Sequence, residues 1–181
     1  MTRTIFYTAT TLDGYLADEY DRLDWLFSQP QEPGGPMNYE SFIPTVGAIA
    51  MGATTYDWIA DHLRSTGDKW SYEVPAWIFS HHPREPMDGA DLRFVSGNVA
   101  APHADMVQAA RDRNIWVVGG GGLATQFAAA GLLDELMLSI APVTLGAGRP
   151  LFPRPFDLTL TELAQNGAFA CARYKVVGAR T

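Results

Sequence analysis

Short apolar runs alternate with helix-like segments through the first three quarters of this chain, and that alternation limits the folds it can form. The runs at 47–52, 75–82 and 115–118 are continuous and apolar, as is typical of strands buried on both faces of a parallel sheet. The segments at 53–63 and 101–114 carry apolar residues at helical spacing. This order predicts an α/β fold with a central, mostly parallel sheet and helices on both faces.

Local signals place further elements around this alternation. Residues 4–10 are rich in β-branched and aromatic types and predict a strand, which ends before the turn pair Asp13-Gly14. A helix is predicted from about Asn38, its N-cap, until Pro44 ends it. The helix that follows the glycine-rich segment is predicted to stop at Gly131.

The last quarter of the chain has a different pattern. Residues 134–146 predict one strand, and residues 156–177 predict two alternating strands around Asn166-Gly167. That dipeptide is typical of a two-residue hairpin turn in which both positions need a positive φ. We therefore expect an antiparallel hairpin at the edge of the parallel sheet. No internal repeat or low-complexity linker appears, so residues 1–181 are expected to form a single domain.

Composition excludes several classes of protein. Hydrophobic residues make up 47% of the 181 residues and charged ones 18%, which argues against disorder. A net charge of −7 without a basic run argues against a nucleic-acid partner. No apolar run approaches the roughly 18 residues that span a bilayer, and the N-terminus does not resemble a signal peptide, so we expect a cytoplasmic protein without a membrane partner.

Metal and disulfide chemistry are not expected either. The single cysteine, Cys171, cannot form an internal disulfide, and its strand-like surroundings favour a core position. The His81-His82 pair has no second cluster of ligand residues to complete a metal site.

Four consecutive glycines, Gly119–Gly122, lie between an apolar run and a helix-like segment. Glycines let a backbone approach a phosphate closely, and the following helix start offers unpaired N–H groups. A G-x-G-x-x-A pattern begins at Gly119. It does not indicate a Rossmann domain, because it lies two thirds along the chain and not in the first strand–helix turn. The acidic pair 134–135 also lies at the start of the next strand, which is the wrong end of the sheet for binding a ribose. A tight turn for packing accounts for one or two of these glycines. We therefore predict that this segment binds phosphate.

A second junction of the same kind precedes the helix at 53–63. Gly52, Thr54 and Thr55 lie between a buried strand and that helix. Thr54 or Thr55 could simply cap the helix. Two such junctions in one parallel sheet are more than capping requires, so we predict that they hold the two halves of one dinucleotide.

Several segments, read together, resemble the dihydrofolate reductase superfamily, and they are most similar to the reductase domain of bifunctional riboflavin-biosynthesis proteins and its small stand-alone relatives. These segments run in order from about Thr4 to Tyr174 and are TLDGYLA with DRLDWL, AIAMGATTYDWI, WIFSHH, IWVVGGGGLATQF and DELMLSIAPVTLGAGRPLF. The resemblance implies a dihydrofolate-reductase-like, three-layer fold that binds NADPH. The deaminase half of the riboflavin proteins is not expected, because the sequence has no Cys/His zinc signature and is too short to hold it.

The resemblance also implies which residues contact the cofactor. They are Ala9, Leu16, Gly52, Thr54, Thr55, Ser80, His81, Gly119, Gly120, Gly121, Gly122, Leu123 and Thr125. The loop at 12–16 is expected to close over the nicotinamide. Many relatives have a basic residue where this chain has Ala53, so recognition of the 2′-phosphate is expected from His81, His82 or Arg84, which otherwise form an exposed polar loop.

These features together predict an NADPH-dependent oxidoreductase that transfers a hydride to a small, heterocyclic substrate similar to a pterin or a ribosylaminopyrimidine. Asp13 is the predicted catalytic carboxylate, although a turn role beside Gly14 explains it equally well, and Asp24 competes with it. Trp25 and Glu40 are predicted to bind substrate; Trp25 fits the core equally well, and Glu40 also competes as the carboxylate. The alternatives are a non-catalytic NADP(H)-binding sensor or partner subunit and a flavin-binding protein.

The tail also bears on assembly. The predicted hairpin and the apolar strand between Leu136 and Val143 would leave an exposed antiparallel edge, which is a liability unless it is paired or covered. The resemblance points the same way, because riboflavin-type reductase domains typically pair as two-fold dimers. We therefore predict a homodimer to which the C-terminal strands contribute.

Overall fold

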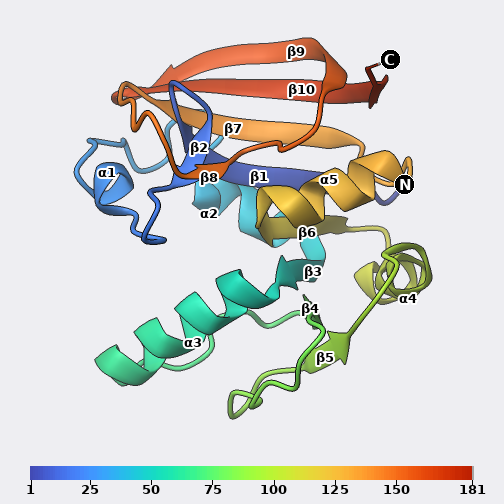
Figure 1. Ribbon diagram of the computed structural model, residues 1–181. Coiled ribbons are helices and arrows are strands. Elements are labelled where there is room, and N and C mark those ends of the chain that lie inside the picture. Colours follow the sequence, from blue (N-terminus) through green and yellow to red (C-terminus); the bar gives the residue numbers. More distant parts are fainter. Residues whose placement is uncertain (181) are drawn as a thin grey trace.

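An eight-stranded sheet with helices on both faces forms the centre of the computed structural model, which describes residues 1–180 (Figure 1). The strands lie in the order β5-β4-β3-β6-β1-β7-β10-β9. The first six of these run parallel to one another, β10 is antiparallel to β7, and β9 is antiparallel to β10. The predicted fold class, a mostly parallel α/β sheet with an antiparallel hairpin at its C-terminal end, is confirmed.

The parallel strands are the apolar runs of the sequence. They are β1 (Thr4–Thr11), β3 (Val46–Gly52), β4 (Ala76–Phe79), β5 (Leu92–Val95), β6 (Asn114–Gly119) and β7 (Glu135–Ala141). Six of the seven residues of β3 are buried, because side chains cover both of its faces. β7 ends at Ala141, earlier than predicted, because the next residue is Pro142, which has no N–H to donate to a neighbouring strand.

Helices cover the two faces of the sheet. On one face lie α1 (Asp24–Phe27), α2 (Tyr39–Phe42), the 3₁₀ turn η1 (Ile43–Thr45) and α3 (Ala53–Thr66), whose buried Tyr56 and Ala60 pack on the sheet as their spacing predicts. On the other face lie α4 (Ala100–Ala110) and α5 (Gly121–Ala129). Asn38 caps α2 as predicted, because its side chain accepts a hydrogen bond of 2.8 Å from Ser41 N.

The C-terminal hairpin consists of β9 (Phe156–Asn166) and β10 (Phe169–Ala179), but its turn differs from the prediction. Asn166 pairs with Phe169, so the turn residues are Gly167 and Ala168, and Gly167 alone of the two has a positive φ, 58°. Asn166 is buried, and its side chain accepts a hydrogen bond from Glu32 N and donates one to Pro36 O. The expectation of two left-handed residues at Asn166-Gly167 was therefore wrong, since Asn166 anchors a distant loop instead.

β9, and not β7, is the edge of the sheet on the antiparallel side. β7 lies between β1 and β10, where its apolar side chains form part of the core. The predicted hairpin therefore forms the antiparallel edge, and only the expectation that residues 136–143 belong to that edge was wrong. The small two-stranded sheet of β2 (Tyr15–Ala17) and β8 (Arg149–Pro150) was not predicted, because these strands are too short to leave a periodic pattern.

None of the helices in residues 1–180 is both long enough and apolar enough to cross a membrane.

Candidate functional site

The order of the strands marks one point in the sheet as a natural crevice. From β3 the chain adds β4 and β5 on one side, and it then returns to place β6 on the other side of β3. The helices that follow β3 and β6, α3 and α5, lie on opposite faces of the sheet (Figure 1). Ligands of open α/β sheets bind at such a switch point, outside the carboxyl ends of the strands.

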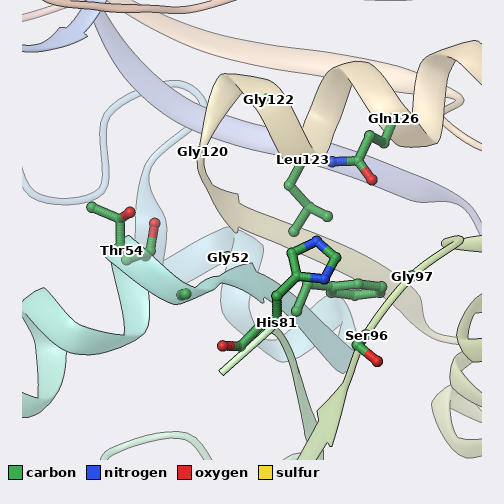
Figure 2. A pocket seen from close by; sticks show the side chains of 13 residues that line it. Gly52, Thr54, His81, Ser96, Gly97, Gly120, Gly122, Leu123 and Gln126 are labelled. Carbon is green, nitrogen blue, oxygen red and sulfur yellow. The ribbon is translucent and has the colours of Figure 1, made fainter. Parts of the chain in front are cut away.

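A cavity of about 330 Å³ lies at this point, between the starts of α3 and α5 (Figure 2). Its walls come from those two helix starts and from the ends of β4 and β5. The lining residues are Gly52, Ala53, Thr54, Thr55, Phe79, Ser80, His81, Ser96, Gly97, Gly120, Gly122, Leu123 and Gln126. Eight of these are residues that the sequence predicted to bind a cofactor, so the fold brings both predicted junctions to one cavity.

Both helices that point at the cavity begin at a glycine. Gly52 is the N-cap of α3 and Gly120 is the N-cap of α5, and within the described residues neither helix start receives a side-chain cap. The capping role considered for Thr54 or Thr55 is therefore not observed. The first N–H groups of a helix have no partner within the helix. Two such sets of donors at one cavity make it suited to bind a phosphate or a pair of phosphates.

The four glycines have two different roles. Gly120, with a φ of 89°, and Gly122 line the cavity. A Cβ at Gly119 would lie 3.0 Å from Thr55 Oγ1, so this glycine lets the end of β6 approach the start of α3. A Cβ at Gly121 would collide with the carbonyl oxygens of Pro150 and Leu151. Gly119 and Gly121 therefore serve packing, and Gly120 and Gly122 are the glycines that face a ligand.

The loop after β1 is joined to the loop after β7. We call residues 12–17 and 143–151 the loop pair. Leu12 N donates to Val143 O and Leu151 N donates to Gly14 O, each at 2.8 Å. The predicted closing segment at 12–16 is therefore held in place by the second loop, which itself packs on the start of α5 through Gly121.

Asp13 makes the central contact of the loop pair. Its carboxylate accepts hydrogen bonds from Thr11 Oγ1 at 2.5 Å, Gly146 N at 2.7 Å and Leu145 N at 3.0 Å. The hydrogen bond from Thr11, with that from Gly146 next, lowers the pKa of Asp13 below its ordinary value of 3.8. An exposed carboxylate that is held ionised outside the cavity is a poor proton donor, so the geometry favours the turn role of Asp13 over its predicted catalytic role.

Replacing Asp13 with asparagine should destabilise the loop pair in a pH-dependent way, because an N–H₂ group would replace an acceptor oxygen. The pKa of Asp13 is lower in the folded protein, so its ionised form stabilises the fold above about pH 4, and that contribution is lost as the pH falls through the folded-state pKa. Urea unfolding at a series of pH values should show that the difference in free energy of unfolding between wild type and Asp13→Asn becomes smaller as the pH falls below about 4. A gap independent of pH, or one equal to that of the exposed control Asp88→Asn, would contradict the assignment.

The other predicted residues lie outside the cavity lining. Trp25 is buried in the core, where its Nε1 has no hydrogen-bond partner among the described residues, and Glu40 is exposed in the first turn of α2. Ala9 and Leu16 are half-buried. Thr125 is buried on α5, and its Oγ1 likewise has no partner within residues 1–180. The substrate-binding role predicted for Trp25 and Glu40 stays a prediction.

Sequence reasoning missed five lining residues: Ala53, Phe79, Ser96, Gly97 and Gln126. Ser96-Gly97 follows a predicted strand, and the carboxyl end of a parallel strand is itself a signal for the ligand edge. Gln126 lies four residues after Gly122, which places it one helical turn further on the same side of α5. Within residues 1–180 no group of three His, Cys, Asp or Glu side chains is arranged to hold a metal ion.

Comparison with known proteins agrees with this architecture. Residues 3–173 match the family described as the RibD C-terminal domain. The chain belongs to this family. It is also 30% identical over 151 residues to the uncharacterized protein YwjB of Bacillus subtilis (strain 168), a match that covers 83% of this chain and 82% of that protein.

Two solved structures are similar to the fold. One is a putative riboflavin biosynthesis protein from Shewanella sp. PV-4, with a TM-score of 0.80 and 26% identity, covering 96% of this chain and 98% of that one. The other is dihydrofolate reductase from Enterococcus faecalis complexed with NADP(H), with a TM-score of 0.59 and 12% identity, covering 97% and 96% of the two chains. The fold is thus dihydrofolate-reductase-like.

Proposed function

We propose that the protein is an NADPH-dependent reductase that transfers a hydride to a small heterocyclic substrate of the pterin or ribosylaminopyrimidine kind. The cavity between two glycine-capped helix starts carries the proposal, because one dinucleotide has two adjacent phosphates to offer to two sets of N–H donors. Membership of the RibD C-terminal domain family supports a reductase. The similar dihydrofolate reductase, which is complexed with NADP(H), supports the choice of cofactor.

The residues at the cavity fit a bound dinucleotide. A Cβ at Gly52 or Gly122 would meet no atom within 4 Å, so the backbone at both positions is open to the cavity. The first-turn N–H groups of α3 and α5 would bind the phosphates, with the hydroxyl groups of Thr54 and Thr55 beside them. The loop pair would support the start of α5 by packing against Gly121.

Bound NADPH supplies a hydride from its nicotinamide ring. The work of the chain is to hold the cofactor and the substrate at reacting distance and to limit the access of bulk water to the site. A proton must also reach the atom next to the reduced carbon. Because three hydrogen-bond donors occupy Asp13, we propose that this proton comes from water rather than from that carboxylate.

One observation favours a second function. No Asp or Glu lines the cavity within the part of the chain that the structure describes, so a non-catalytic NADP(H)-binding sensor or partner protein also fits. The two functions differ in turnover and not in binding.

The experiment that separates them follows the loss of NADPH absorbance when purified protein is mixed with pterins, ribosylaminopyrimidines and simple carbonyls. We expect NADPH to bind and to be consumed with at least one heterocycle. Binding without consumption by any compound would favour the sensor, and consumption with simple carbonyls alone would contradict the substrate class. A yellow preparation that does not bind NADPH would instead indicate a flavin protein.

A further inference from the structure

The loop pair lies on the inner side of the cavity, toward the middle of the sheet. From the two helix starts the cavity reaches outward to the ends of β4 and β5, where Ser80 and Ser96 line it. In the other direction β1 lies next to β6, and the carboxyl end of β1 carries the first loop of the pair. If the helix starts hold the phosphates, as proposed above, one half of the dinucleotide extends toward β5 and the other toward the loop pair. Hydride transfer benefits from shielding against bulk water, so the nicotinamide half suits the side of the loop pair.

The first loop continues into a compact turn at residues 18–22. Asp18 Oδ1 accepts hydrogen bonds from Tyr20 N at 2.8 Å and from Arg22 N at 2.9 Å. Within this turn Asp21 has a left-handed conformation, with a φ of 61°. Aspartate adopts that conformation more readily than most residues. The turn therefore holds the Asp21 carboxylate in a defined position.

Arg149, in the second loop, forms a two-point ion pair with that carboxylate. Its Nε donates to Asp21 Oδ1 at 2.6 Å, and its Nη2 donates to Asp21 Oδ2 at 2.9 Å. The planar guanidinium matches a carboxylate in this arrangement, so each group fixes the orientation of the other. Beside the ion pair, β2 and β8 join the two loops through their backbones (Figure 1). A Cβ at Gly148 would collide with Ala17 O, so the loops are also in direct contact there.

This ion pair is exposed to solvent. The side chains of Arg149 and Asp21 are 57 and 36% exposed. Exposed ion pairs contribute little to the stability of a fold, although a two-point arginine–carboxylate pair contributes more than most. Local opening of a loop costs much less free energy than unfolding of the whole chain. A pair of this strength therefore has little effect on global stability but a measurable effect on how often the two loops separate.

We propose that Arg149 is a positioning residue that acts through Asp21: it holds the two loops together beside the nicotinamide half and so limits the rates at which NADPH enters and leaves. The proposal rests on the proposed function, because it assumes a dinucleotide in the cavity. Both partners of the ion pair belong to the chain, so it stabilises the closed loop pair to the same extent before and after binding. Its removal should therefore speed association and dissociation by the same factor and leave the dissociation constant nearly unchanged.

Stopped-flow fluorescence with NADPH tests the proposal, using wild type, Arg149→Met, Asp21→Asn and the variant with both substitutions. Asparagine also adopts a positive φ readily, so Asp21→Asn removes the charge and keeps the turn. We expect each single variant to raise both rate constants about threefold and to change the dissociation constant less than about twofold. The double variant should equal the single variants, because all three lack the same interaction. High salt should remove the difference between wild type and Arg149→Met, since it screens exposed charges.

Arg22→Met is the matched control. Arg22 is also exposed and forms an ion pair with Asp18, but this pair and its contact with the ring of Tyr20 lie within the turn at 18–22. The rate constants of this variant should equal those of wild type. If Arg149→Met does not fold, Asp21→Asn tests the same ion pair.

Four outcomes would overturn the proposal. Wild-type rate constants in Arg149→Met and Asp21→Asn would refute it and leave the proposed function standing. Faster dissociation with unchanged association would show that Arg149 supports the bound cofactor and does not control its passage. Faster exchange in Arg22→Met as well would show that the effect does not need a link between the two loops. Failure of wild type to bind NADPH would refute the proposed function, and this proposal with it.

Discussion

The substitution Gly122→Val should weaken NADPH binding at least tenfold, about 1.4 kcal/mol, while the protein still folds. A Cβ at this position meets no atom within 4 Å, so the protein has room for the new side chain. That room is the cavity itself, beside the start of α5, where the cofactor phosphates are proposed to lie. Fluorescence titration with NADPH measures the loss.

Substitutions at two other glycines show how this test is controlled. Gly178→Val is the matched control, because a Cβ there also meets no atom within 4 Å, and the residue lies on β10, away from the cavity. Its NADPH affinity should equal that of wild type. Gly121→Val is unsuitable, because its side chain would collide with the backbone of Pro150 and Leu151 and impair folding. A folded Gly122→Val protein with wild-type affinity would refute the phosphate site.

The sequence predicted the location of the cavity because local rules determine it. Alternating strands and helices define the parallel sheet; Gly52 is the last residue of β3, and Gly120–Gly122 directly follow β6. The ends of parallel strands meet at one edge, so two junctions of this kind had to face the same side of the molecule. The sequence could not show which glycines face a ligand and which serve packing, because Gly121 packs against Pro150 and Leu151, which belong to another loop.

The roles of Asp13 and Asn166 were hard to predict for one reason. Asp13 was predicted as catalytic, yet its partners Leu145 and Gly146 lie far along the chain. Asn166 was predicted as a turn residue, yet its side chain bonds to the loop near Glu32. Both residues satisfy backbone groups of distant loops, and no local pattern records such partners. For a short polar residue next to a glycine, the sequence does not distinguish a turn role from a hydrogen bond to a distant loop.

The edge strand β9 leads to the last prediction, which concerns assembly. Leu158, Leu160 and Leu163 are 39, 50 and 66% exposed. The register with β10 places all three on one face, since their partners are Val176, Tyr174 and Ala172. An apolar stripe along an edge strand invites pairing. We propose that a second copy of the chain covers it in a two-fold dimer, the commonest symmetric assembly. β9 and the cavity lie at opposite sides of the sheet, so the two cavities would stay apart.

Light scattering at micromolar concentration should give wild type twice the mass of one chain. The double variant Leu160→Glu with Leu163→Glu should give the mass of one chain, because charges in the centre of an apolar contact are costly to bury. Val107→Glu is the control: Val107 is 39% exposed, as Leu158 is, but it lies on α4 outside the cavity lining, and its variant should remain a dimer. All three proteins should bind NADPH, which shows that they are folded. A single-chain mass for wild type, or a double variant that stays dimeric, would refute this interface.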